Sequence, residues 1–156
     1  MLRELKAFFK GFAYAFSGII HGFKTQRNMR FHLCAGTAAL ILSLVCKVSD
    51  TELCIVLLCI GAVISSELIN TAVESAVDMA CGGKISSLAK AAKDCAAGAV
   101  LICAAVSLAC GAVIFLKPER LAVIAELLAD NPVHGILSAV WLAAAFWFVF
   151  GIKKKM

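Results

Sequence analysis

Residues 53–80 read LCIVLLCIGAVISSELINTAVESAVDMA and decide the fold of this chain. The first half, Leu53 to Ser66, is a run of apolar and small residues. Four polar residues follow, and their spacing places them within about 80° of one another on one face of a helix: Glu67, Asn70, Glu74 and Asp78. A carboxylate inside a bilayer costs about 2.5–3.5 kcal/mol, so this stripe is expected to face a bundle interior, a metal or a polar substrate.

The composition is typical of a membrane protein. Hydrophobic residues make up 62% of the 156 residues and the mean hydropathy is +0.95, whereas a soluble domain is about half apolar. Two segments, Cys95 to Leu116 and Val133 to Ile152, carry no charge and can each cross about 30 Å of hydrocarbon. Two shorter runs, Leu33 to Cys46 and Leu53 to Ser66, become spans when each helix continues into polar residues. The sequence therefore predicts an all-α membrane protein with four transmembrane helices.

The chain divides into four regions. An N-terminal stretch that mixes aromatic and basic residues predicts an amphipathic helix lying in the membrane interface. A three-span core follows, then an external amphipathic connector, then a fourth span with a basic cytoplasmic tail. The N-terminal helix takes up residues 1–27. The core covers residues 28–117, with spans at about 28–47, 51–80 and 88–116. The connector is residues 118–132, and the fourth span with its tail is residues 133–156.

The basic residues predict the orientation of the spans, because flanking Lys and Arg tend to stay cytoplasmic. With both termini inside, twelve of them are cytoplasmic and three are outside, namely Lys47, Lys117 and Arg120. This arrangement places the carboxylate stripe on the cytoplasmic side, where ATP is. The net charge of +5 then reflects orientation and attraction to anionic lipid, and nucleic acid is not an expected partner.

Two further features argue against a disulfide or zinc site and against a Walker-type phosphate loop. The eight cysteines lie mostly in the spans without CxxC spacing, which favours packing over disulfides or zinc. The loop CGGKISSLAKAAKD begins at Cys81; its glycines are expected to end the second span, and Ser86 or Ser87 to cap the third. This loop lacks the glycine spacing of a Walker-type phosphate loop.

The stripe matches what phosphoryl transfer requires: divalent metal, a cation near the transferred group and a residue that deprotonates the attacking hydroxyl. Glu67, nearest the apolar segment, is the candidate general base for a lipid hydroxyl, and Glu74 the candidate Mg²⁺ ligand. Lys93 is the candidate cation. The alternative is purely structural: the stripe pairs with Lys90, Lys93 and Arg30 across a helical interface.

Two blocks of sequence carry a resemblance to a known family. ELINTAVESAVD from Glu67 to Asp78 and LAKAAKDCAAGAVL from Leu88 to Leu101 resemble the small prokaryotic lipid kinases, the family of diacylglycerol kinase and undecaprenol kinase. The segment RNMRFH, Arg27 to His32, is similar to the undecaprenol kinases of Gram-positive bacteria. The resemblance implies a multi-pass protein of the bacterial cell membrane that takes ATP-Mg²⁺ as phosphoryl donor and a lipid alcohol as acceptor.

The resemblance also implies roles for residues that match the family pattern. It places Glu67 as the catalytic base and Glu74 as a metal ligand, with Asn70 and Asp78 supporting that site. It places Lys93 and Asp94 against the nucleotide, with Tyr14 near it. The family fold is a homotrimer with sites between subunits.

Three departures from the family pattern stand out. Gln26 occupies the position of a second metal-binding glutamate, and a neutral amide ligates Mg²⁺ more weakly than a carboxylate. The loop that contacts the nucleotide in relatives reads Lys84 to Ser87 in this chain, with one inserted residue. Beyond Leu116 the chain continues into a further span for which the family assigns no role.

Three functions remain in competition. The first is ATP-dependent phosphorylation of undecaprenol or diacylglycerol, with undecaprenol favoured by RNMRFH alone. The second, motivated by Gln26, is a weak or inactive relative that acts as a structural or lipid-sensing membrane protein. A channel or transporter is disfavoured, because the polar stripe ends halfway through the second span and the apolar parts of the other spans carry no charged residue.

Overall fold

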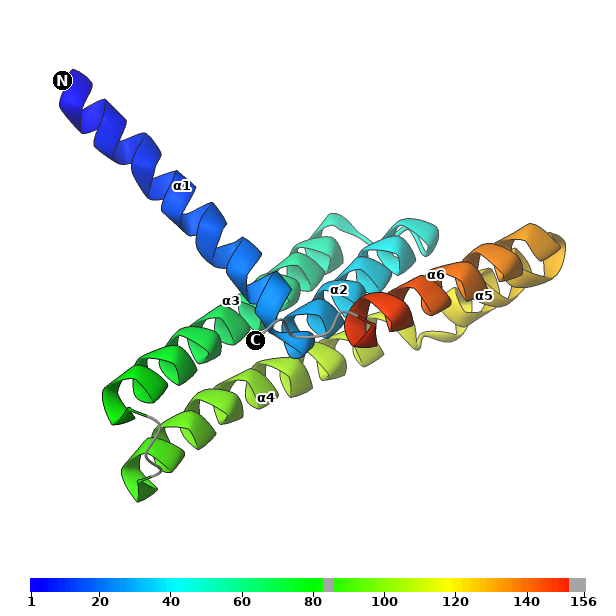
Figure 1. The fold of residues 1–156 in the computed structure, drawn as a ribbon. Helices are drawn as coiled ribbons and strands as arrows, with labels where there is room; N and C mark the ends of the chain where they lie inside the picture. The colour runs from blue at the N-terminus through cyan, green and yellow to red at the C-terminus, as the bar shows by residue number, and fades with distance from the viewer. Residues whose placement is uncertain (83–85, 152–156) are drawn as a thin grey trace.

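The computed structural model describes residues 1–82 and 86–151. Within these residues the chain forms six helices and no strand, which confirms the predicted all-α fold (Figure 1). The helices are α1 (Leu2–Thr25), α2 (Arg27–Val45), α3 (Asp50–Cys81), α4 (Ser87–Phe115), α5 (Pro118–Asp130) and α6 (Pro132–Phe150).

Four of these helices, α2, α3, α4 and α6, are long and apolar enough to cross a membrane. The bounds of α2, α3 and α4 agree within two residues with the three spans predicted for the core. The predicted connector contains α5, and α6 begins at Pro132, one residue before the predicted fourth span. The basic tail, Lys153 to Lys155, and Lys84 of the loop lie outside the described residues.

The length of α3 explains how one helix carries both an apolar segment and a polar stripe. Its 32 residues span about 48 Å, well beyond the roughly 30 Å of a hydrocarbon core. Ser49 and Glu52 form a capping box at its start, and Gly82 ends it in the left-handed conformation with φ of 54°. Ser86 caps α4 by accepting a hydrogen bond from the Ala89 N–H over 3.1 Å. The predicted break between the two helices is therefore confirmed.

The helices pack into an open bundle. Figure 1 shows α3 and α4 side by side, with α2 against α3 and α6 running along α2. Small residues permit close approach: a Cβ at Gly36 of α2 would lie 3.2 Å from Ile60 Cγ2 of α3. The described core is thin, since most large apolar side chains of the spans are exposed. Exposed apolar faces are expected of helices surrounded by lipid.

The N-terminal helix leaves the bundle. Figure 1 shows α1 projecting away, and most of its aromatic side chains are exposed. Only its C-terminal end is packed: a Cβ at Gly22 would lie 3.0 Å from Leu68 Cδ2 of α3. This contact brings α1 to the α3 turn that contains Glu67.

Candidate functional site

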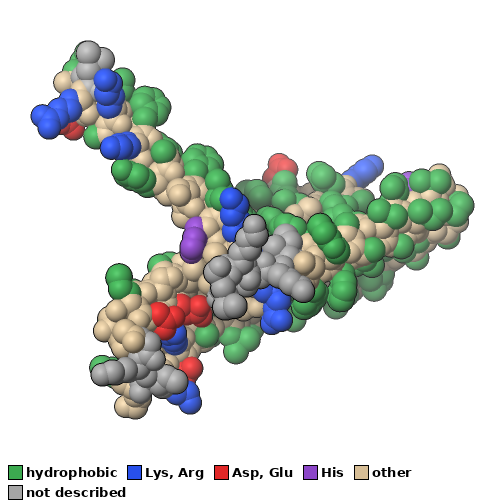
Figure 2. All heavy atoms as spheres, in the orientation of Figure 1, with side chains coloured by type: hydrophobic (Ala, Val, Ile, Leu, Met, Phe, Trp, Pro, Cys, Tyr) green, Lys and Arg blue, Asp and Glu red, His purple; other side chains and the backbone are tan. Residues whose placement is uncertain are grey.

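The polar stripe of α3 runs from a buried to an exposed position. Glu67 is only 2% exposed and Asn70 and Thr71 are also buried, Glu74 is half-buried, and the Asp78 side chain is 67% exposed. Figure 2 shows carboxylate and basic groups gathered where the α3–α4 pair ends. The described structure therefore has a carboxylate enclosed by protein at one end of the stripe and a solvated carboxylate at the other.

Asn70 links the middle of the stripe. Its Nδ2 donates to Glu74 Oε1 over 3.2 Å. The amide must point this way, because its oxygen would repel the carboxylate. Asn70 Oδ1 is consequently a buried oxygen without a hydrogen-bond partner among the described residues. A buried acceptor left unpaired costs about 1–3 kcal/mol, so this atom is poised for a donor or a cation.

The side-chain oxygens of Asn70 and Glu74 suit a magnesium ion that binds together with phosphate groups. The described residues contain no group of three or more His, Cys, Asp or Glu side chains that could hold a metal alone. Mg²⁺, however, is usually bound by one or two carboxylates, water and substrate phosphates. Glu74 and the unpaired Asn70 oxygen supply oxygen ligands of that kind.

A cation from α4 completes this end of the bundle. Lys93 Nζ lies 2.5 Å from Asp78 Oδ1, and its charge also interacts with Glu74. Both partners of the ion pair are at least one-third exposed, so the pair contributes little to stability and a phosphate can replace Asp78. Lys90 and Asp94, on the same first turns of α4, are exposed.

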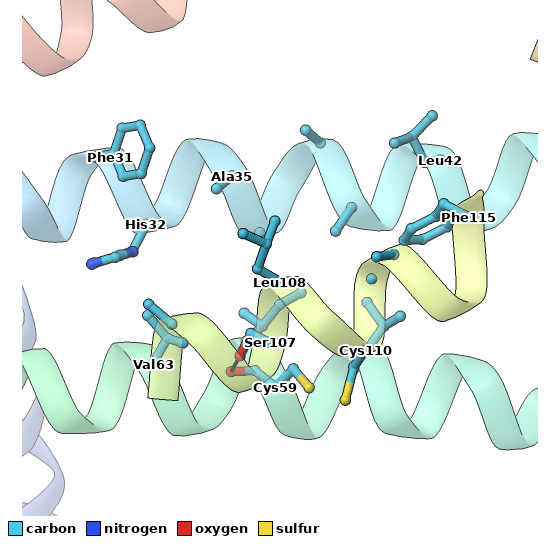
Figure 3. Close-up of a pocket in the computed structure, with 18 of the residues that line it drawn as sticks. Phe31, His32, Ala35, Leu42, Cys59, Val63, Ser107, Leu108, Cys110 and Phe115 are labelled. Carbon is cyan, nitrogen blue, oxygen red and sulfur yellow. Dashed lines mark hydrogen bonds between the residues drawn. The ribbon is translucent and has the colours of Figure 1, made fainter. Parts of the chain in front are cut away.

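An apolar groove approaches the buried end of the stripe. It has a volume of about 670 Å³ and lies between α2, α3 and α4 (Figure 3). Val63, one turn before Glu67, forms part of its wall, and His32 points into it from α2. Its remaining lining is almost entirely aliphatic, aromatic or thiol. An apolar hydrocarbon chain fits such a groove, whose α3 wall ends one turn before Glu67.

Three further residues expected at the site lie on α1, at the corner between α1 and α2, and in the first turn of α2. Tyr14 is 66% exposed on the projecting part of α1. Gln26 is half-buried at the corner between α1 and α2. Arg30 is buried and donates to the carbonyl oxygens of Phe23 and Val149. Among the contacts that the structure describes, none joins Tyr14 or Gln26 to the α3 stripe.

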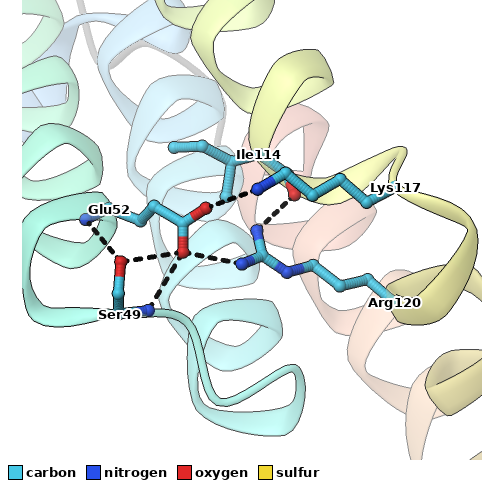
Figure 4. Close-up of polar contacts among 5 residues, drawn as sticks. All are labelled: Ser49, Glu52, Ile114, Lys117 and Arg120. Carbon is cyan, nitrogen blue, oxygen red and sulfur yellow. Dashed lines mark hydrogen bonds and ion pairs between the residues drawn. The ribbon is translucent and has the colours of Figure 1, made fainter.

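The structure also contains a cluster that the sequence did not reveal, at the other end of α3. Glu52 accepts from Lys117 over 2.9 Å and from Arg120 over 2.6 Å, and Arg120 also donates to the Ile114 carbonyl (Figure 4). Hydrogen bonding to Glu52 raises the pKa of Arg120. The cluster ties the start of α3 to the α4–α5 turn. Opposite charges were its only sequence signal, and they do not identify partners 65 residues or more apart.

Comparisons with known proteins agree with this architecture. The family model of prokaryotic diacylglycerol kinase matches residues 13–115, which include all of α2, α3 and α4 and exclude α5 and α6. An undecaprenol kinase of Bacillus subtilis is 46% identical over 113 residues, which are 72% of this chain and 91% of the relative. A diacylglycerol kinase of Synechocystis is 39% identical over 107 residues, 69% of this chain and 61% of the relative.

No solved structure matches the chain significantly. The family match nevertheless covers about two-thirds of the chain, including both sequence blocks from Glu67 to Asp78 and from Leu88 to Leu101. The chain therefore belongs to the prokaryotic diacylglycerol kinase family of membrane lipid kinases.

Proposed function

We propose that this protein transfers the γ-phosphoryl group of ATP to the hydroxyl group of a membrane lipid. The observation that carries the proposal is the buried carboxylate of Glu67, one helical turn beyond Val63, where the α3 wall of an apolar groove ends. The hydrocarbon chain of the acceptor lies in the groove and its hydroxyl meets Glu67. Glu67 accepts the hydroxyl proton as the oxygen attacks the phosphorus atom, with ADP as the leaving group.

The cytoplasmic end of the stripe binds the nucleotide in this proposal. Glu74 and Asn70 Oδ1 hold Mg²⁺, which when bound neutralises phosphate charge. Lys93 moves from Asp78 to the transferring phosphoryl group, where a positive charge stabilises the transition state. Asp94 and Lys90 border the nucleotide from α4, and Asp78 supports Lys93 when the nucleotide is absent.

We infer a homotrimer with each site completed by a neighbouring copy. The family resemblance supports this assembly, and so does the projection of α1, whose Tyr14 is exposed and available to another protomer. Cross-linking in membranes followed by mass measurement tests it, and a chain that remains monomeric under these conditions contradicts the assembly. The same proposal places the protein in the bacterial cell membrane with both termini cytoplasmic.

Undecaprenol is the preferred acceptor and diacylglycerol the second. The name of the 46% identical Bacillus relative supports this order, as does the RNMRFH segment. The groove itself discriminates weakly, because apolar contacts separate hydrocarbon chains by only about 1–3 kcal/mol per methylene.

The deciding experiment measures lipid phosphorylation by detergent-purified protein with labelled ATP and Mg²⁺, offering undecaprenol and diacylglycerol separately. Glu67→Gln should lower turnover by about 10²–10⁴-fold, the range expected for a lost general base. Glu126→Gln, an exposed carboxylate of α5, is the matched control and should retain activity. Absence of turnover on both lipids by folded wild-type protein would favour the inactive relative suggested by Gln26.

A further inference from the structure

One arginine joins the C-terminal ends of two helices that are far apart in sequence. Arg30, in the first turn of α2, is 4% exposed. Its Nη1 donates to the Phe23 carbonyl near the end of α1 over 3.1 Å, and its Nη2 donates to the Val149 carbonyl near the end of α6 over 3.2 Å. The guanidinium therefore spans the corner at which α1, α2 and α6 converge.

Both acceptor carbonyls need such a donor. The last four carbonyls of a helix lack partners within the helix, and Phe23 and Val149 lie among them. Neither helix ends in the left-handed glycine conformation that often satisfies these groups: Gln26 caps α1 in an extended conformation, and Gly151 caps α6 with φ of −77°. The negative ends of both helix dipoles also favour a cation at this point.

A second contact strengthens the same junction. The Arg27 guanidinium lies 5.6 Å from the centroid of the Phe150 ring, at the last residue of α6. A cation over an aromatic face is attracted by the negative face of the ring. Two interactions from the first turn of α2 thus fix the end of α6 on the start of α2.

We propose that Arg30 is a positioning residue and that α6 is a brace, which together fix the angle between α1 and the rest of the bundle. The corner matters for the site because α1 packs at Gly22 against Leu68, the neighbour of Glu67. The family match ends at residue 115, so α6 is an addition to the shared kinase core. The effect on catalysis rests on the proposed function, whereas the brace itself does not.

Hydrogen exchange of the full chain in detergent, followed by mass spectrometry, tests the brace. Arg30→Met should accelerate amide exchange about tenfold or more at the ends of both α1 and α6, because hydrogen bonds from a charged donor are lost. Phe150→Ala, a substitution within α6, should accelerate exchange at the end of α1. Leu142→Ala, an exposed residue of the same helix, is the control and should leave α1 unchanged.

The outcomes separate the brace from the kinase. Unchanged exchange at the end of α1 in Phe150→Ala would overturn the brace, even if Arg30→Met fails to fold. If exchange rises as expected and lipid phosphorylation falls several-fold in Phe150→Ala, with unchanged KM for ATP, Arg30 and α6 position the site. If exchange rises with no change in phosphorylation, the catalytic role is overturned. Inactive wild-type protein with the expected exchange pattern would contradict the proposed function and leave the brace supported.

Discussion

Asn70 donates its Nδ2 hydrogen to Glu74 Oε1 over 3.2 Å, one turn further along α3, and its own Oδ1 is left as a buried acceptor. The bond orients a carboxylate and presents an amide oxygen beside it. We expect Asn70→Ala to raise the Mg²⁺ concentration needed for half-maximal activity by about 10–100-fold, the usual effect of losing a group that supports a metal ligand. A Mg²⁺ titration of the kinase reaction measures this.

Ser75→Ala is the control for this prediction, because the Ser75 hydroxyl bonds only the Thr71 carbonyl of its own helix in the described structure. It should leave the Mg²⁺ dependence unchanged. Equal shifts in the two variants would mean that the stripe responds to general loosening of α3 and that Asn70 has no specific part in metal binding.

The Lys93–Asp78 ion pair predicts an asymmetric result. Lys93→Met should lower kcat/KM by about 10²–10³-fold, because it removes a positive charge from the transition state. Asp78→Asn should cost much less, since the Asp78 side chain is 67% exposed and its pairing is that of a surface ion pair. Steady-state kinetics with varied ATP separates the two.

Lys90→Met supplies the comparison for Lys93, since Lys90 is exposed one turn earlier on α4. A small effect is expected at Lys90. The assignment of the phosphoryl-binding cation would move to Lys90 if that substitution proved the more damaging.

Gln26 offers a gain-of-function test. Gln26→Glu should lower the Mg²⁺ requirement, because a carboxylate ligates Mg²⁺ better than an amide. Gln26 is both the N-cap of α2 and the C-cap of α1, so the opposing helix dipoles should leave stability little changed by the new charge. Thr25→Glu places a similar charge one residue earlier, so a gain specific to Gln26→Glu separates metal binding from a general effect of negative charge at this corner. No difference between them would mean that Gln26 lies outside the metal site.

Local patterns predicted the helices, whereas contacts between distant segments could not be predicted. The stripe from Glu67 to Asp78 follows from the helical repeat, and the end of α3 follows from the conformational freedom of Gly82. The partners of Arg30 and Glu52 depend on how the helices pack, with residues 119 and 68 positions apart brought into contact. No periodicity in one segment encodes such a pairing.

The same distinction explains the candidate site. Glu67, Asn70 and Glu74 share one helix, so their spacing predicted that they lie together. Tyr14 was assigned through the family resemblance alone, and in the single chain it is exposed on the projecting α1. Its proximity to nucleotide stays a prediction that requires the proposed neighbouring protomer, which the sequence of one chain does not specify.

The ionic cluster around Glu52 should stabilise the bundle without serving catalysis. Glu52→Gln removes the charge that holds Lys117 and Arg120, so the melting temperature should fall while phosphorylation by the folded protein is retained. Thermal unfolding followed by circular dichroism, with Glu119→Gln as an exposed control, measures this. A loss of activity at temperatures where Glu52→Gln remains folded would argue that the two ends of α3 are coupled.

The apolar groove can be tested by filling it. Ala35→Trp introduces a large ring into the groove wall on α2, and overfilling a packed apolar space costs about 1–3 kcal/mol. If the lipid chain occupies the groove, this substitution should raise the KM for lipid about tenfold and leave the KM for ATP unchanged. Ala105→Trp, on the exposed side of α4 and outside the groove, should change neither constant. A change confined to the KM for ATP would place the nucleotide, and not the lipid, next to the groove, and Glu67 would then need a different approach for its acceptor.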